Sequence, residues 1–260
     1  MTDSSTSLPL VCTYGEGKNK AIQLAEKWGF SLSKKVTSGL YLELSIEHLA
    51  LKDADDPKLG GVFVDFASDA LEYRRKHGGG KQEFVAKAVG LKGDAQPSVV
   101  DATGGLGRDA FILASLGCNV TLIERSPVVA ALLADGIERA GINDMVSDWL
   151  PQRMRLIHGD SAEVMQAMVE TGERPEVVYL DPMFPHRKKS AQVKKEMRLF
   201  QSLLGGDLDA DGLLAPALNL AQKRVVVKRP GSAGVLAGSK PSSTVASKKH
   251  RFDIYFTHSN

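Results

Sequence analysis

A short segment in the last third of the chain carries residues suited to chemistry on an aromatic amine. Asp181, Pro182 and Phe184 follow directly after the apolar run 177–180. Such an amine is a poor nucleophile, because its lone pair is delocalised into the ring. The Asp181 carboxylate or the Pro182 carbonyl could accept its hydrogen bonds, orienting the lone pair and stabilising the charge that grows on nitrogen. Phe184 could stack on the base. The sequence thus predicts a catalytic loop here, although a rigid turn with a capping Asp would use the same residues.

A glycine-rich loop earlier in the chain predicts a ligand-binding turn between a strand and a helix. The apolar run 98–102 leads into Gly104, Gly105 and Gly107, and a helical pattern begins at Arg108. Glycines allow positive φ and close approach of a ligand, and the helix N-terminus supplies free amides. The segment 105–110 also fits the dinucleotide pattern G-x-G-x-x-A. Asp101, just before the glycines, favours S-adenosylmethionine, because a carboxylate there can accept from the methionine ammonium.

Two further acidic sites are expected at the ends of the next two strands. Glu124 ends the run 120–124, where it would hold a ribose diol in either interpretation of the glycine loop. Asp160, with Ser161 beside it, follows the third strand and can accept from an adenine amino group. Asp160 or Ser161 would also serve as an ordinary helix N-cap.

Strands and helices alternate from residue 82 onward, which predicts an α/β fold with a mainly parallel sheet covered on both faces. The predicted strands are 98–102, 120–124, 156–158, 177–180, 224–228 and 252–257, and the predicted helices are 82–89, 108–116, 126–140, 162–169 and 194–204. Residues 230–242, rich in Gly, Ser and Pro, are expected to form a loop before a closing hairpin.

A smaller α/β unit is expected before this region. Its predicted elements are a helix at 18–28, ended by Gly29, and strands at 10–14, 40–44, 49–51 and 62–66. Gly78, Gly79 and Gly80 mark a hinge. The predicted division is therefore an N-terminal unit, residues 1–77, and a larger domain, residues 78–260.

Composition indicates a globular protein of the cytoplasm. Of the 260 residues, 43% are hydrophobic and 25% are charged. The sequence has no apolar run of transmembrane length and no signal-peptide pattern, so we expect no membrane association. Its two cysteines show no metal or redox spacing, which suits a reducing compartment and predicts no metal site.

Basic residues are clustered, although the formal net charge is only +2. The run after the catalytic loop lies where RNA phosphates would arrive, so we expect RNA binding at Arg187, Lys188, Lys189, Lys194 and Lys195. A second cluster, residues 74–81, is as compatible with a solvated surface as with RNA binding.

With these motifs placed, the chain resembles the class I S-adenosylmethionine-dependent methyltransferases, and within them the J family of small-subunit ribosomal RNA guanine-N2 methyltransferases. The resemblance is carried by Arg74 with the segment 78–82, by the segments 101–109 and 123–125, and by Asp-Pro-Met-Phe-Pro-His-Arg-Lys-Lys at 181–189. Met183 stands where the wider superfamily has a second proline.

The resemblance implies a Rossmann-like fold, with a seven-stranded sheet whose last strand is antiparallel. It implies S-adenosylmethionine as cofactor and guanine N2 in small-subunit (16S) ribosomal RNA, or in the small subunit itself, as substrate. It also implies cofactor contacts at Arg108, Asp109, Glu124, Arg125, Asp160, Ser161 and Asp181. An NAD-dependent oxidoreductase would share the glycine loop, and a non-catalytic RNA-binding assembly factor would share the fold and the basic run.

Overall fold

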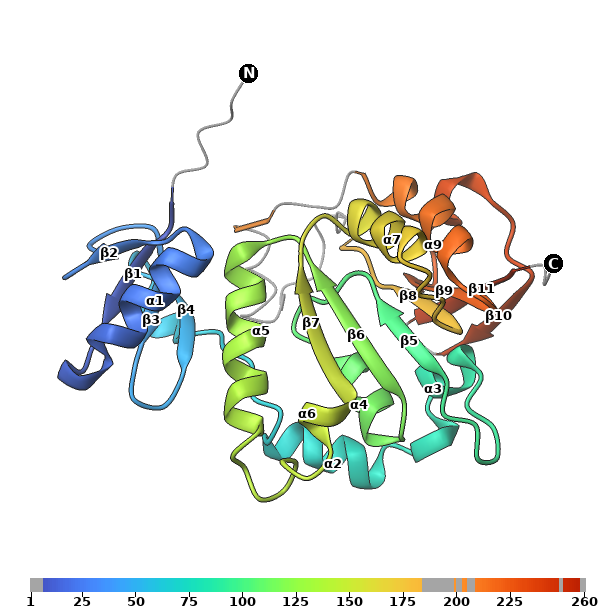
Figure 1. Ribbon diagram of the computed structural model, residues 1–260, viewed down its shortest axis with the longest axis horizontal. Coiled ribbons are helices and arrows are strands. Elements are labelled where there is room, and N and C mark those ends of the chain that lie inside the picture. The colour runs from blue at the N-terminus through green and yellow to red at the C-terminus, as the bar shows by residue number, and fades with distance from the viewer. Residues whose placement is uncertain (1–6, 184–198, 200–202, 205–208, 248–249, 258–260) are drawn as a thin grey trace.

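The larger region forms one seven-stranded mixed sheet (Figure 1). The computed structural model describes residues 7–183, 199, 203–204, 209–247 and 250–257. The strand order is β10-β11-β9-β8-β5-β6-β7. Within it, β5 to β9 are parallel and β11 runs antiparallel to β9, which confirms the predicted Rossmann-like sheet. The strands are β5 (Ser98–Asp101), β6 (Asn119–Glu124), β7 (Met154–His158), β8 (Val177–Leu180), β9 (Arg224–Pro230), β10 (Ser243–Ala246) and β11 (His250–Phe256).

Helices cover both faces of this sheet, because alternate residues of each central strand point to opposite faces. Val99 and Val177 pack with α3 (Phe84–Val89), α4 (Arg108–Ser115) and α5 (Pro127–Ala140). Val100 and Val178 pack on the other face with α7 (Ser161–Glu170) and α9 (Leu214–Leu220). Both sets are buried, which explains why these strands read as nearly continuous apolar runs.

The strand order reverses direction between β5 and β8. The chain moves from β5 outward through β6 to β7 and then returns to place β8 on the other side of β5. Open α/β sheets bind ligands in the crevice at the carboxyl ends of the strands on either side of such a reversal. The glycine loop follows β5 and Asp181 follows β8, so the fold brings the two predicted motifs to one crevice.

A four-stranded sheet of order β2-β1-β3-β4 forms the N-terminal part of the chain and lies beside α5 (Figure 1). Its elements are β1 (Pro9–Cys12), α1 (Lys18–Trp28), β2 (Ser31–Ser33), β3 (Leu40–Leu44) and β4 (Leu49–Asp53). Buried Asp135 of α5 accepts from the Leu49 backbone N–H at 3.2 Å and from Arg139 Nε at 2.8 Å. This shared carboxylate ties the small sheet to the larger one.

Several elements differ from those predicted. The strand expected at 62–66 is absent: only Val62 bridges to Leu51, and the chain then turns away toward α2 (Asp69–His77). The missed elements are α2, β2, the short α6 (Leu150–Arg153) and α9. Short 3-10 helices occupy Gly15–Gly17, Pro57–Leu59, Gly80–Gln82, Ala210–Leu213 and Leu236–Gly238. The helix expected at 194–204 lies largely outside the described residues. The division at residues 77 and 78 stays a prediction, and α2 packs on α4 of the larger region.

Candidate active site

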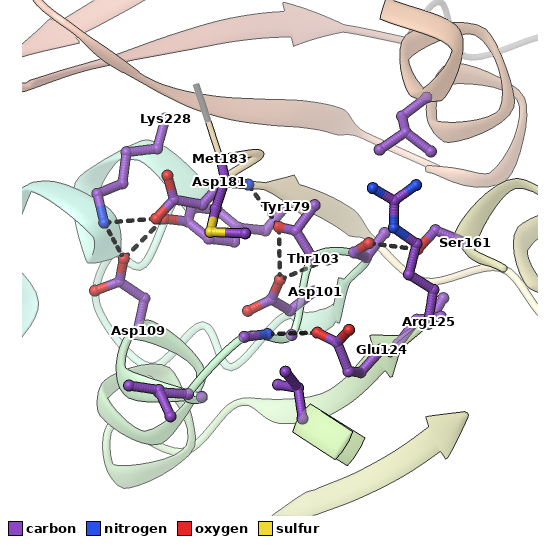
Figure 2. Close-up of a pocket in the computed structure, with 18 of the residues that line it drawn as sticks. Asp101, Thr103, Asp109, Glu124, Arg125, Ser161, Tyr179, Asp181, Met183 and Lys228 are labelled. Carbon is purple, nitrogen blue, oxygen red and sulfur yellow. Dashed lines mark hydrogen bonds and ion pairs between the residues drawn. The ribbon is translucent and has the colours of Figure 1, made fainter. Parts of the chain in front are cut away.

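A cavity of about 420 Å³ lies at the carboxyl ends of β5, β6 and β8 (Figure 2). All of the residues predicted to contact the cofactor line it, namely Asp101, Gly104, Gly105, Gly107, Arg108, Asp109, Glu124, Arg125, Asp160, Ser161 and Asp181. The predictions were made from separate stretches of sequence, and the fold brings those stretches to one crevice.

The glycine loop turns sharply between β5 and α4. Gly105 and Gly107 have φ of +51° and +68°, a region that side chains with a Cβ rarely adopt. A Cβ at Gly107 would lie 3.1 Å from the side chains of both Leu133 and Phe66. The Gly104 backbone N–H donates to the Ile123 carbonyl at 2.9 Å, which fixes the loop to the neighbouring strand β6. The glycines are therefore required by the backbone itself.

Asp101 is a buried carboxylate at the end of β5, with 3% of its surface exposed. Its Oδ1 accepts from the Thr103 backbone N–H at 3.1 Å and from the Thr103 hydroxyl at 3.3 Å. Burial raises the pKa of Asp101 to about 7, against the hydrogen bonds from Thr103. A cationic group placed against this carboxylate would favour its ionised form.

Asp109 sits at the start of α4, where several donors converge on it (Figure 2). Lys228 Nζ lies 2.9 Å from Oδ2, the Tyr179 hydroxyl donates to the same oxygen at 2.8 Å, and Arg74 donates to Oδ1 at 2.9 Å. Burial opposes ionisation, but Lys228 and Arg74 outweigh it and lower the pKa of Asp109 to about 2. Asp109 is thus an anion held by two cations.

Asp181 follows β8 and shares Lys228 with Asp109. Lys228 Nζ lies 2.8 Å from Asp181 Oδ2, and the Asp181 backbone N–H donates to the Thr103 hydroxyl at 2.6 Å. The Asp181 side chain is 39% exposed and opens into the cavity. Desolvation by the surrounding protein raises the pKa of Asp181, while Lys228 lowers it. Pro182 is buried beside it, and Phe184 lies outside the described residues.

Glu124, at the end of β6, is held by backbone amides. Its Oε2 accepts from the Gly105 N–H at 2.9 Å and its Oε1 from the Ser126 N–H at 2.8 Å. The neighbouring Arg125 pairs with Asp209 at 2.7 Å. Glu124 therefore braces the glycine loop as well as lining the cavity.

Asp160 and Ser161 begin α7. Asp160 Oδ1 accepts from the N–H groups of Ala162 and Glu163, at 2.9 and 3.1 Å, so the predicted N-cap is present. The Ser161 hydroxyl donates to the Ala102 carbonyl at 2.7 Å and ties α7 to β5. Both residues still line the cavity, so capping and ligand binding are compatible here.

The basic residues expected to bind RNA, Arg187, Lys188, Lys189, Lys194 and Lys195, lie outside the described residues. The other cluster is described, and carboxylates neutralise much of it. Arg74 pairs with Glu83 and Asp109, and Arg75 pairs with Glu72 at 2.7 Å. The arginines of this cluster are thus paired with carboxylates of the protein itself.

Comparison with known proteins places the chain in a family. The model of a family described as "Putative SAM-dependent methyltransferase" matches residues 23–257. A protein of Pseudoalteromonas atlantica called ribosomal RNA small subunit methyltransferase J is 63% identical, over 91% of this chain and 92% of its own length. A Klebsiella pneumoniae protein of the same name is 56% identical over 95% and 96%. The chain belongs to the ribosomal RNA small subunit methyltransferase J family.

A solved structure agrees with this placement. The crystal structure of a SAM-dependent methyltransferase from Neisseria gonorrhoeae superposes with a TM-score of 0.78 at 38% identity, covering 97% of each chain. Membership of the methyltransferase J family decides between the two interpretations of the glycine loop in favour of S-adenosylmethionine. Among the described residues, no helix is long and apolar enough to cross a membrane.

The cavity suits the cofactor of the methyltransferase J family. S-adenosylmethionine carries an ammonium, a sulfonium and an adenosine, and it has no pyrophosphate. Burial raises the pKa of the Asp101 carboxyl group to about 7. The ammonium of the cofactor would stabilise the ionised form of this group. Glu124 and Asp160 supply acceptors for hydroxyl and amino donors at the β6 and β7 ends.

Sequence reasoning missed three site residues, Thr103, Tyr179 and Lys228, and it missed the role of Arg74. Thr103 joins Asp101 to Asp181, and the other three hold Asp109. Lys228 was the hardest to predict, because on β9 it directly follows three valines that indicate a core strand. The available signal was its position: a lysine directly after the buried run Val225–Val227 needs an anionic partner nearby.

Proposed function

We propose that this chain transfers a methyl group from S-adenosylmethionine to the N2 amine of a guanine in small-subunit ribosomal RNA. The substrate RNA is inferred from the names of the close relatives, and the place of the reaction is inferred from the cavity. The observation that supports the proposal most directly is the position of Asp181, whose carboxylate opens into the same cavity as the glycine loop.

The cofactor supplies an electrophilic methyl group on a sulfonium. We assign Asp101 to its ammonium, Glu124 to its ribose hydroxyls, and Asp160 with Ser161 to its adenine. Gly104, Gly105 and Gly107 let the backbone approach it closely. Arg108, Asp109 and Arg125 complete the wall around it. These assignments follow the sequence predictions, and they are supported by the fact that all of the residues line one cavity.

Asp181, together with the Pro182 carbonyl, is assigned to the target amine. By accepting hydrogen bonds from the N–H groups of this amine, the two oxygens would orient the nitrogen lone pair toward the methyl group. They would also stabilise the positive charge that develops on nitrogen. A separate strong base is not required, because the amine proton becomes acidic once nitrogen is alkylated. Phe184 is assigned to stacking on the base, which must be flipped out if it comes from paired RNA.

The RNA is assigned to the basic run that follows the catalytic loop, at Arg187, Lys188, Lys189, Lys194 and Lys195. Cations directly beyond the target-base site would meet the phosphates that flank it. We place the reaction in the cytoplasm, where ribosomal RNA is present and where free cysteines such as Cys12 and Cys118 stay reduced.

The deciding experiment is transfer of radiolabelled methyl from S-adenosylmethionine to ribosomal RNA and to small subunits from cells lacking this enzyme, followed by nucleoside analysis. Label in N2-methylguanosine is the expected result. Label in another nucleoside would overturn the base assignment. Protein that binds both cofactor and RNA but transfers no label would instead be a non-catalytic assembly factor.

A further inference from the structure

Lys228 is half-buried at the centre of the site, yet neither the assigned cofactor contacts nor the target-base contacts include it. It lies on β9, which pairs in parallel with β8 so that Leu180 is level with Val227. The next residues along the chain are therefore Asp181, directly after β8, and Lys228 on β9. This register brings the ammonium to the carboxylate, with Nζ 2.8 Å from Asp181 Oδ2.

Asp109 has other partners that would remain without Lys228. Arg74 donates to its Oδ1, and the Tyr179 hydroxyl donates to its Oδ2. Among the interactions of the described residues, Asp181 has no second cation at hydrogen-bonding distance. Within the described part of the chain, loss of Lys228 would therefore remove the paired cation of Asp181 but leave Asp109 paired with Arg74.

The groups around Asp181 come from several elements and differ in sign. Asp109 of α4 and Asp101 of β5 bring further carboxyl groups, whereas Lys228 of β9 and His250 of β11 bring positive charge. Burial and these carboxyl groups raise the pKa of Tyr179 on β8 well above its ordinary value, so its hydroxyl stays neutral. Lys228 is the nearest of the opposing charges and is 21% exposed, so its field is only partly screened by water. Without it, two neighbouring carboxylates would disfavour the Asp181 anion.

From this geometry we propose that Lys228 is a positioning residue for methyl transfer, which keeps Asp181 ionised and holds Oδ2 so that Oδ1 is left to accept from the target amine. A protonated Asp181 would present a hydrogen-bond donor to an amine that needs an acceptor. This inference rests on the function proposed above for Asp181, but its first test does not require RNA.

The first test measures the ionisation of Asp181 directly in ligand-free protein. Carboxyl-labelled aspartate is followed by ¹³C NMR against pH, and the Asp181 signal is identified by its loss in Asp181→Asn. In Lys228→Met the midpoint should rise by about one pH unit or more, the effect of removing an adjacent opposite charge. Lys228→Arg should stay near wild type.

The matched control is Lys223→Met, which removes another lysine next to β9 that pairs with Glu176 instead. It should leave the Asp181 midpoint unchanged. Lys228→Gln, which keeps a donor to Asp109, replaces Lys228→Met if the latter does not fold. An unchanged midpoint in a folded, charge-removed variant would overturn the proposal.

The second test uses turnover. In Lys228→Met, kcat at pH 7 should fall about tenfold or more, as for loss of one preorganised electrostatic contact, and its acid limb should move to higher pH. KM for S-adenosylmethionine should change much less, and Lys228→Arg should restore kcat. A lower kcat with an unmoved acid limb would mean that Lys228 is only structural.

A double-mutant cycle completes the design. Adding Lys228→Met to Asp181→Asn should slow the enzyme little further, because the second change acts through a residue already lost. Independent, additive losses would contradict the proposal. If the wild-type protein transfers no methyl at all, the proposed function fails, and the NMR titration alone still decides whether Lys228 sets the charge of Asp181.

Discussion

The two ends of the cavity hold their carboxylates in different ways. At the ion-paired end, Asp109 and Asp181 share the ammonium of Lys228, and Asp109 also meets Arg74. At the amide-capped end, Glu124 accepts from the N–H groups of Gly105 and Ser126, and Asp160 from those of two residues in the first turn of α7. Backbone amides do not titrate, whereas neighbouring charges shift one another.

This difference suits the two tasks that we assign to the ends. A cofactor that is bound in one way every cycle is best met by acceptors fixed to the backbone. Methyl transfer to a weak nucleophile needs a carboxylate of controlled charge, and here the pKa values are displaced in opposite directions, to about 2 at Asp109 and upward at Asp181. The chemistry is thus expected to be more sensitive to pH than cofactor binding through Glu124.

Breaking the ion-paired end should have the largest effect. We expect Asp181→Asn to lower kcat for methyl transfer about a hundredfold or more, because the acceptor that stabilises charge on the amine is lost. Affinity for S-adenosylmethionine, measured by calorimetry, should change much less. Because burial raises the pKa of Asp181, wild-type kcat should fall as the pH drops through that raised value, and the variant should lack this limb.

The matched control is Asp148→Asn, at an exposed aspartate between α5 and α6. It should turn over like wild type. Wild-type turnover by Asp181→Asn itself would remove Asp181 from the mechanism.

Breaking the amide-capped end should give the opposite pattern. In Glu124→Gln, one of the two amide-accepting oxygens becomes an NH₂ group that faces a backbone donor. We expect affinity for S-adenosylmethionine to fall about tenfold, the cost of one charge-assisted hydrogen bond, in calorimetry at fixed pH. The acid limb of kcat at saturating cofactor should stay in place. A displaced limb would mean that the two ends are electrostatically coupled after all.

The same contrast explains what sequence could predict. The cap at Asp160 is local: Asp160 directly precedes α7, so its position in the sequence was enough to predict the cap. The contacts of Glu124 with the Ser126 and Gly105 amides were not predicted. Alternating strands and helices predicted a mainly parallel sheet with both faces covered, but they did not give the order of its strands. The ion pairs are not local, because Lys228 and Arg74 lie 119 and 35 residues from Asp109. Only strand register and the packing of α2 on α4 reveal those partners.

The strand expected at 62–66 failed for a related reason. Val62, Val64 and Phe66 alternate and are buried, as in a strand, but they are buried by packing as an irregular segment across the small sheet and α5. Periodicity reports which side chains are buried, and it does not report whether the backbone has a hydrogen-bonded neighbour.

RNA affinity should depend on the basic run and should change without any effect on either end of the cavity. We expect Lys188→Glu with Lys189→Glu to weaken RNA binding about fivefold at moderate salt and to reduce the slope of log K against log salt by about one to two. Lys34→Glu with Lys35→Glu is the matched control, because these exposed neighbours follow β2, far from β8 and β9 (Figure 1). An unchanged slope in the first pair would leave the basic run as a solvated surface.

Asp101 belongs to neither end, since it is buried without a neighbouring cation among the contacts that the structure describes, and its replacement should have a small effect on the ligand-free protein. Its pKa of about 7 lies above the ordinary 3.8, so the folded state holds a proton that the unfolded state releases. The free energy of unfolding should therefore fall as pH rises from about 4 to 7 and then level off. Asp101→Asn, which keeps an acceptor for Thr103, should raise the melting temperature of ligand-free protein by a few degrees at pH 8 and by nothing near pH 4.

The same variant should bind S-adenosylmethionine more weakly, because the carboxylate assigned to its ammonium is gone. Wild-type affinity should also strengthen with pH up to about 7, as Asp101 ionises, while that of the variant stays flat. Melting curves with and without cofactor at pH 5.5, 7 and 8 measure both effects together. A variant that is more stable but binds the cofactor as tightly as wild type would show that Asp101 is a strained core residue with no part in binding.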